Sequence, residues 1–337
     1  CCASGPAETS EGANWGEGQV ILTVTLNAAI DRTVAVPNFR LGRRHRAVES
    51  RTVAGGKGVN VARALNLLGR PVIAAGFVGG PTGTRMLEQL QEESVLTDFT
   101  RIAAETRINL AVIDPTSGEQ TEINERGPAV SPEEVQRLFE RIAYLAGGAR
   151  LCVLAGSVPP GAGDDLYARL ISDLSRRGIP VVLDAEGEAM LEGIRAGASM
   201  VTPNEREAEE LVGQEFADRG DLAQGLLELV RLGAGEAAIT RPEGCVAAVG
   251  EGSSRRLLEV HTEPLEPVST VGSGDAFLAG YAAARYEGRS PEECLAYGVA
   301  CGAESTQHFG AGTVDRNQVE RLVGEVSVHD LEVPAEV

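Results

Sequence analysis

One short stretch in the last quarter of the sequence carries glycines and an aspartate at a spacing suited to phosphate chemistry. Gly272, Ser273, Gly274 and Asp275 join a turn to a predicted helix over 275–286. Glycines let successive backbone N–H groups point into one concavity at the helix N-terminus, where the helix dipole stabilises an anion. Asp275 is placed to accept the proton of a hydroxyl that attacks a phosphoryl group. An ordinary helix cap is the alternative, because Asp and Gly are common at caps.

A second glycine-rich stretch, AGGKGVNVA over 54–62, precedes the first by about two hundred residues. Together with STVGSGDAFLAG over 269–280, it resembles the two signatures of the PfkB (ribokinase-like) carbohydrate kinase family, in that family's order. The resemblance covers about residues 19–325 and is greatest to the 1-phosphofructokinase and tagatose-6-phosphate kinase branch. It implies that Asp275 is the catalytic base and that the amides of Gly272–Gly274 form an anion hole.

The resemblance also implies where the sugar binds. Asp31 ends the segment TLNAAID and matches a carboxylate that accepts hydrogen bonds from sugar hydroxyls. Gly55 and Gly56 permit close backbone approach, and the amide of Asn60 can both donate and accept. Ser157, in the loop GSVPPG, is a further candidate for substrate contact. Without the resemblance, Asp31 and Ser157 read as turn residues and Asn60 as a polar residue at a helix start.

Three cations predict that the sugar already carries a phosphate. Lys57 lies inside the first signature, Arg107 lies in TRINL, and Arg46 lies on the proposed lid within 33–53. Arginine supplies the two-pronged donor that phosphate prefers. Each cation is alternatively a solvated surface charge, and this applies most to Arg46, because Arg43 and Arg44 crowd beside it.

The nucleotide is expected on the other side of the Gly272–Asp275 turn. Asn204 and Glu207 fit the family's Asn-x-x-Glu motif, and the resemblance implies that Glu207 organises water around the Mg²⁺ that ATP brings. An acidic first turn that complements the helix dipole is the alternative. Thr240 and Gly244 fall where relatives line the nucleotide site. The dipeptide Arg241-Pro242 between them departs from the family pattern, which puts these nucleotide contacts in question.

The elements that must position these residues follow from the hydrophobic pattern. Apolar runs alternate with segments of helical period, which predicts an α/β fold: a doubly wound, mostly parallel sheet with helices on both faces. Stretches 33–53 and 107–123 instead alternate apolar and polar residues, which predicts a small β-sheet that acts as a lid over the cleft. The expected apolar runs are 20–26, 72–78, 151–155, 180–183, 199–201 and 237–239, and the expected helices include 59–68, 133–146 and 222–232.

We expect one kinase domain over 19–325, flanked by a disordered tail at 1–18 and a C-terminal tail at 326–337. The first of these is rich in Gly, Ala, Ser and Glu and has no periodicity. An apolar outer face on the lid would let two copies pair through it as a homodimer.

Composition excludes several classes of partner. The chain has 49 acidic and 30 basic residues, a formal charge of −19, and 4% aromatic residues, which argues against nucleic acid and anionic membranes. Its six cysteines include no CxxC pair, and no apolar run reaches the roughly 18 residues that span a bilayer. We therefore expect a cytoplasmic protein without a membrane segment.

These patterns predict ATP-dependent phosphorylation of a hydroxyl on a phosphorylated ketohexose, giving a bisphosphate. Fructose 1-phosphate ranks first as the substrate, followed by tagatose 6-phosphate and fructose 6-phosphate. The sequence has neither a Walker GxxxxGK[ST] motif nor a GxGxxG motif after its first strand. Two alternatives remain: a kinase of an unphosphorylated sugar or nucleoside, and a non-catalytic regulator that binds a sugar phosphate.

Overall fold

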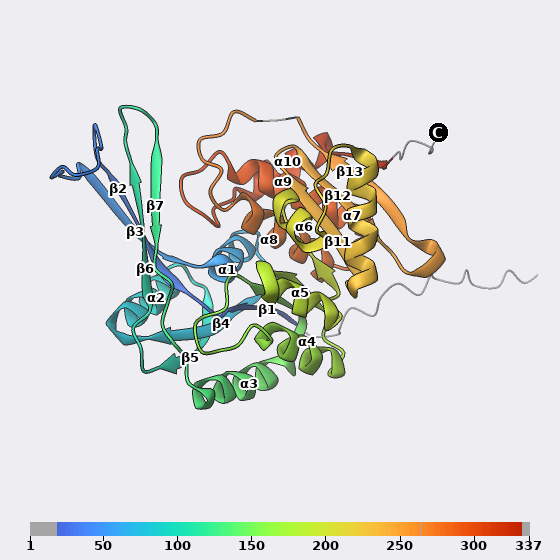
Figure 1. The fold of residues 1–337 in the computed structure, drawn as a ribbon, viewed down its shortest axis with the longest axis horizontal. Helices are drawn as coiled ribbons and strands as arrows, with labels where there is room; N and C mark the ends of the chain where they lie inside the picture. The colour runs from blue at the N-terminus through green and yellow to red at the C-terminus, as the bar shows by residue number, and fades with distance from the viewer. Residues whose placement is uncertain (1–18, 264, 332–337) are drawn as a thin grey trace, which may run out of the picture.

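A central sheet runs through the computed structural model, which describes residues 19–263 and 265–331 (Figure 1). Its strands are β1 (Val20–Thr25), β4 (Val72–Gly79), β5 (Leu96–Ile102), β8 (Ala149–Ala155), β9 (Val181–Asp184), β10 (Met200–Val201), β11 (Glu236–Arg241), β12 (Gly244–Val249), β13 (Arg256–His261) and β14 (Ser327–Asp330). Within the described ranges they follow the order β14-β13-β12-β11-β10-β9-β8-β1-β4-β5. The strands from β11 to β5 are parallel and the three at the other edge are antiparallel.

Helices cover both faces of this sheet, which confirms the predicted doubly wound α/β fold. They are α1 (Lys57–Leu67), α2 (Gly80–Glu92), α3 (Pro132–Ala146), α4 (Leu166–Arg176), α5 (Gly187–Arg195), α6 (Glu205–Val212), α7 (Arg219–Leu232), α8 (Ser273–Tyr286), α9 (Pro291–Ser305) and α10 (Arg316–Leu322). One apolar cluster packs α1, α2, α8, α9 and α10 against the sheet, and a second packs α3 to α7 against the opposite face. The central strands are buried on both sides, which explains their continuous apolar sequences.

A separate four-stranded sheet stands away from this body (Figure 1). It consists of β2 (Ala29–Ala35), β3 (Glu49–Gly55), β6 (Arg107–Ile113) and β7 (Gln120–Asn124), in the order β3-β2-β6-β7. The β2–β6 pair is parallel and the other two pairs are antiparallel. The small sheet predicted from 33–53 and 107–123 is therefore present, and β2 begins slightly earlier than expected. We call it the lid sheet.

The end of the described chain differs from the expected tail at 326–337. Ser327–Asp330 forms β14, which pairs antiparallel with β13 at the sheet edge, and Leu331 is 6% exposed. Val328 packs against one apolar cluster and Leu331 joins the other. A strand of four residues with one apolar member is too short to show a periodic pattern, which is why the sequence did not reveal it. The predicted tail at 1–18 lies outside the described residues.

No helix in the described part of the chain is long and apolar enough to cross a membrane. Cys152, Cys245, Cys294 and Cys301 are free thiols and are buried.

Candidate active site

The N-terminus of α8 is open to an incoming anion. Gly272 precedes the helix with a φ of 83°, a left-handed conformation that favours glycine. Among the described residues, the N–H groups of Gly274 and Asp275 have no hydrogen-bond acceptor, whereas that of Ser273 donates to the Thr270 carbonyl at 3.3 Å. Two first-turn amides and the positive end of the helix dipole are therefore available.

Asp275 lies in this first turn and is 7% exposed. Burial and, to a lesser extent, the nearby carboxyls of Asp184 and Asp31 raise the pKa of its carboxyl to about 7. A hydrogen bond from Asn60 and the charge of Lys57 act in the opposite direction. A carboxylate with a pKa close to neutrality is suited to take a proton during catalysis.

The two glycine-rich signatures meet at Asn60 and Asp275. Asn60 lies on α1, is 6% exposed, and donates from Nδ2 to Asp275 Oδ2 at 2.8 Å. Helices α1 and α8 pack against each other, so two segments 215 residues apart form one site.

Lys57, the first residue of α1, is surrounded by carboxylates. Its Nζ lies 3.2 Å from Asp184 Oδ1 and 3.7 Å from Glu186 Oε1. Burial lowers the pKa of Lys57, but Asp184, Glu207, Asp275 and Glu186 together raise it above its usual value, so the side chain stays charged. Sequence reasoning expected Lys57 at the phosphate of the substrate, and the structure places it among acidic groups next to Asp275.

Asp31 on β2 is paired in register with Asn109 on the neighbouring strand β6 of the lid sheet. Asn109 Nδ2 donates to Asp31 Oδ1 at 2.9 Å, and burial raises the pKa of Asp31. A Cβ atom at Gly55 would lie 2.0 Å from Asp31 Oδ2, so a side chain there would displace this carboxylate, and the φ of 106° at Gly56 is a conformation that favours glycine. Sequence reasoning did not identify Asn109, although the alternation in TRINLAV was a usable signal for its face.

Arg107 and Ser157 are connected through Asn27, which sequence reasoning also missed. Arg107 Nη2 donates to the Asn27 carbonyl at 3.0 Å, and Nη1 donates to the Glu125 carbonyl at 2.8 Å. Asn27 Nδ2 donates to Ser157 Oγ at 3.1 Å. Burial lowers the pKa of Arg107. Arg107 is close enough to Asp31 for their charges to interact. Arg107 and Ser157 therefore border the same region as Asp31.

Arg46 does not join this group. It lies in the exposed connection over 36–48 between β2 and β3 and has no hydrogen bond or ion pair with any residue that the structure describes. Its predicted contact with a phosphate has no support within one copy of the chain.

Asn204 and Glu207 form a reciprocal cap at the start of α6. Asn204 Oδ1 accepts from the Glu207 N–H, and Glu207 Oε2 accepts from the Asn204 N–H, both at 2.9 Å. Thr240 N–H donates to the Pro203 carbonyl at 2.9 Å, which brings the end of β11 to this cap. Burial raises the pKa of Glu207, with Asp184 and Glu186 adding to the effect. A hollow of about 460 Å³ borders Asn204, Glu207 and Glu186.

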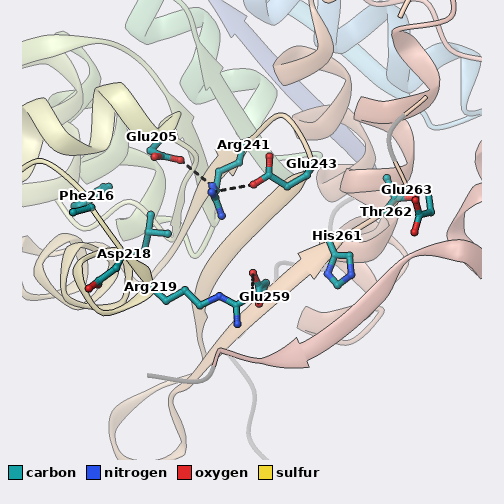
Figure 2. Close-up of a pocket in the computed structure, with 12 residues that line it drawn as sticks. Glu205, Phe216, Asp218, Arg219, Arg241, Glu243, Glu259, His261, Thr262 and Glu263 are labelled. Carbon is teal, nitrogen blue, oxygen red and sulfur yellow. Dashed lines mark hydrogen bonds and ion pairs between the residues drawn. The ribbon is translucent and has the colours of Figure 1, made fainter. Parts of the chain in front are cut away.

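Arg241, where the sequence departs from the family pattern, is held by two ion pairs. Its Nε lies 2.8 Å from Glu205 Oε2 and its Nη2 lies 3.0 Å from Glu243 Oε1, as the dashed lines in Figure 2 show. These residues line a hollow of about 620 Å³ beside the β11–β12 hairpin, and Asp275 and Lys57 are not part of its lining. Gly244 closes the hairpin, where a Cβ atom would lie 2.1 Å from the Val260 carbonyl oxygen.

The carboxylates near Lys57, those of Asp184 and Glu207, fit a cation whose direct ligands are mainly phosphate oxygens and water. Within the described ranges, no three His, Cys, Asp or Glu side chains are arranged to hold a metal ion by themselves. Burial raises the pKa of Asp184 as well as that of Glu207, which is the electrostatic situation that added positive charge relieves. Mg²⁺ carried by nucleotide phosphates matches this donor set, because it usually keeps several waters.

Comparison with known proteins identifies relatives over nearly the whole chain. A 1-phosphofructokinase of Bacillus subtilis is 32% identical over 92% of this chain and 99% of its own length. A 1-phosphofructokinase of Borreliella burgdorferi is 29% identical over 93% of this chain and 99% of its own. Two structures of Escherichia coli phosphofructokinase-2, one with fructose-6-phosphate and one a tetrameric inhibited form, each have a TM-score of 0.83 at 28% identity and cover 90% of this chain and 98% of theirs. Residues 22–317 match the pfkB family of carbohydrate kinases, and the chain belongs to this family.

Proposed function

We propose that this protein transfers the terminal phosphoryl group of ATP to a hydroxyl of a phosphorylated ketohexose, giving a bisphosphate. Fructose 1-phosphate is the first candidate, followed by tagatose 6-phosphate and fructose 6-phosphate. The observation that carries this proposal is the buried Asp275 carboxylate beside free amides at the start of α8. The relatives named 1-phosphofructokinase, and phosphofructokinase-2 in complex with fructose-6-phosphate, support the class of substrate.

The mechanism assigns each step to a side chain. Asp31, oriented by Asn109, binds hydroxyls of the sugar, and Arg107 faces its phosphate. The acceptor hydroxyl lies at Asp275, which takes its proton as the oxygen attacks phosphorus. The amides of Gly274 and Asp275 receive the negative charge of the phosphoryl group in transfer. ATP lies toward Asn204, Thr240 and Gly244.

Bound Mg²⁺ would neutralise charge on the phosphates of ATP, with Glu207 holding its water shell and Asp184 nearby. The partners are thus the phosphosugar and Mg-ATP, and we assign the reaction to the cytoplasm, where ATP is abundant and free buried thiols are stable.

One observation keeps the kinase of an unphosphorylated acceptor as a second candidate. Lys57 is paired with Asp184, and Arg107 is bonded to backbone carbonyls. A phosphate would have to compete with these contacts or add to them. The substrate panel below decides between the two functions.

We further propose a homodimer through the face of the lid sheet opposite Asp31. The strand register places Val34, Ile108, Leu110 and Ile123 on that face, and Ile108 and Ile123 are 40% and 57% exposed. Exposed apolar residues grouped on one sheet face are typical of an interface. The tetrameric form of the Escherichia coli relative agrees with self-association in the family.

The test of function is an ADP-release assay with Mg-ATP and six acceptors: fructose 1-phosphate, fructose 6-phosphate, tagatose 6-phosphate, fructose, ribose and adenosine. We expect turnover of one phosphoketose at a kcat/KM at least about 10²-fold above that for fructose. Turnover of only the unphosphorylated acceptors would replace the proposal with the second candidate. Binding of a phosphosugar without any turnover would identify a non-catalytic regulator.

A further inference from the structure

Arg63 lies one turn after Asn60 on α1 and is bonded to several parts of the site. Its side chain is 11% exposed. Nε and Nη2 donate to the two carboxylate oxygens of Glu93, which follows α2, at 2.6 and 3.2 Å. Nη1 donates to Asn60 Oδ1 at 3.1 Å and to the Ala311 carbonyl at 3.3 Å, and Nη2 donates to the Ala54 carbonyl at 2.7 Å. All five N–H groups of the guanidinium therefore have an acceptor.

This arrangement determines which end of the Asn60 amide faces Asp275. A guanidinium has donors and no acceptor, so the Asn60 atom beside Arg63 must be the oxygen. The nitrogen is then left to donate to Asp275 Oδ2 at 2.8 Å. A donor aimed at the carboxylate stabilises its ionised form, which is the form that can take a proton. A reversed amide would instead accept a hydrogen bond from the protonated acid and favour it.

The same guanidinium holds two pieces of backbone that border the reacting groups. The Ala54 carbonyl directly precedes Gly55, which packs against Asp31. Ala311 packs against Gly272, where an added Cβ would lie 2.4 Å from the Ala311 Cβ atom. Movement of Arg63 would thus release both the backbone beside Asp31 and the backbone that packs over the N-terminus of α8. Figure 1 shows α1 and α8 adjacent at the centre of the molecule.

We propose that Arg63 is a positioning residue for phosphoryl transfer: it orients the Asn60 amide toward Asp275 and secures Ala311 over the N-terminus of α8. This inference rests on the proposed function, because it takes Asp275 as the base. Arg63 acts through Asn60 and Ala311 and does not contact the substrate. Lysine cannot replace it, since three donors on one nitrogen cannot reach acceptors on three separate segments.

Other charged groups also act on Asp275, so the test must separate geometry from charge. Lys57 faces Asp275 from α1, Asp184 from the end of β9 and Asp31 from β2. The charge of Arg63 itself lowers the pKa of Asp31. Arg63→Lys keeps this charge and removes the planar guanidinium with its five N–H donors, whereas Arg63→Met removes both the charge and the donors.

Arg70 provides a matched control. It follows α1, is 13% exposed, and its Nη2 lies 2.6 Å from Glu287 Oε1, so Arg70→Met also breaks a mostly buried ion pair. We expect Arg63→Lys and Arg63→Met to lower kcat at pH 7 by about 10-fold and to raise KM for the sugar by a smaller factor, because Ala54 beside the Asp31 region also loses its donor. The acidic limb of kcat/KM should move up by about one pH unit, the scale of a lost hydrogen bond to a charged group. Arg70→Met should lose stability only, with an unchanged pH profile.

A double-mutant cycle tests whether Arg63 acts through Asn60. In an Asn60→Ala background, Arg63→Met should reduce kcat much less than it does in the wild type. Equal reductions in the two backgrounds, or an unshifted acidic limb in Arg63→Lys, would overturn the proposal. If Arg63→Met does not fold, Glu93→Gln, which weakens the hold on Arg63, takes its place in the cycle with the same expectation.

A measurement without substrate separates this inference from the proposed function. The ¹⁵N side-chain amide signal of Asn60 can follow the ionisation of Asp275 by NMR as pH is varied. Arg63→Lys should raise the midpoint of that titration by about one unit, and Arg70→Met should leave it in place. An unchanged midpoint in Arg63→Lys would contradict the role of Arg63, whereas a wild-type enzyme inactive on every acceptor would contradict only the function.

Discussion

The Asp275 carboxyl is subject to opposing influences from its neighbours. Burial and the charges of Asp184 and Asp31 favour the neutral acid, while the Asn60 amide and Lys57 favour the carboxylate. The result is a pKa of about 7. Such a group is basic enough to remove a proton from a hydroxyl and is still ionised in a large fraction of molecules at neutral pH.

Asp275→Asn should bind the phosphosugar nearly as well as the wild type but lose turnover. Asparagine keeps the shape and a hydrogen-bond acceptor for Asn60, and it cannot take the proton. We expect kcat to fall by about 10² or more, the range for loss of a general base. Steady-state kinetics with calorimetric binding of the sugar checks this, and turnover close to wild type would remove Asp275 from the mechanism.

The raised pKa of Asp275 also sets the direction of two pH effects. Only the ionised form is active, so kcat/KM should rise with pH through about 7 and then level off. For stability the sign is opposite. The folded-state pKa exceeds the ordinary value of 3.8, so the proton stabilises the folded state at low pH and this contribution is lost as pH rises through about 7.

Asp275→Asn should consequently have a higher Tm than the wild type at pH 8, and the difference should shrink toward pH 4. Thermal unfolding of both proteins across this range measures it. A wild-type Tm that equals or exceeds the variant's at pH 8 would show that the ionised Asp275 carboxylate does not destabilise the folded state.

Single residues of the site could be predicted from the sequence better than the contacts between them. Asp31, Lys57, Asn60 and Asp275 stand in recognisable motifs. Asn109 lies in TRINLAV and Arg63 directly follows the first signature, but their roles depend on strand register and on the meeting of α1 with a distant loop. No local pattern encodes such pairings.

At the level of secondary-structure elements, the turn into α8 combines a special backbone conformation with tight packing. Gly272 has a positive φ, and Ala311 leaves no room for a side chain. Gly178 has a φ of 73° with nothing within 4 Å of an added Cβ, so it shares only the first constraint.

Gly272→Ala should therefore lower both Tm and kcat, whereas Gly178→Ala should lower Tm alone. A left-handed alanine costs about 1–2 kcal/mol in either place, and displacement of Ala311 adds to the cost at Gly272. We expect kcat of Gly272→Ala to fall at least about 10-fold, since the amides after it would shift. Equal losses of Tm with unchanged turnover in both variants would refute this account.

Arg107 begins β6, so the lid sheet fixes its position. Arg107→Ala should raise KM for the phosphoketose by about 10-fold or more and change KM for fructose far less, because a charge-assisted contact is lost. The comparison needs both acceptors assayed on the same preparation. Equal changes for the two would return Arg107 to the role of a structural donor to Asn27 and Glu125.

Element prediction succeeded where the pattern was long and failed at the edges of the sheet. The strands β1, β4 and β8 are dominated by apolar residues, and α3 has both periodicity and a capping box at Ser131. By contrast, the edge strands β5 and β14 mix charged or polar with apolar residues because one side of each meets solvent. Edge strands therefore lack the pattern that identifies central ones.

On the scale of the whole molecule, the net charge of −19 opposes anionic ligands, so the cations at the site must act locally. The lid sheet stands apart from the main body (Figure 1), and Ile108 and Ile123 on its face opposite Asp31 are exposed. An exposed apolar sheet face is unfavourable in an isolated monomer.

Ile123→Asp should convert the proposed dimer to monomers, raising its Kd by at least about 10-fold, because a charge would be buried at the interface. Leu227→Asp is the matched control, since Leu227 is 47% exposed on α7, away from the lid. Light scattering after size-exclusion chromatography measures both. A wild-type monomer, or a dimer that survives Ile123→Asp, would rule out this interface.

The contact between Asn60 and Asp275 also has a consequence for the order in which the molecule is made. A ribosome releases α1 long before α8, because 215 residues separate the two side chains. At a synthesis rate of roughly 5–20 residues per second, α1 waits on the order of 10–40 s for the helix that covers it. The apolar face of α1 that packs against α8 is uncovered during that interval, and the contact between Asn60 and Asp275 forms only after α8 has been synthesised.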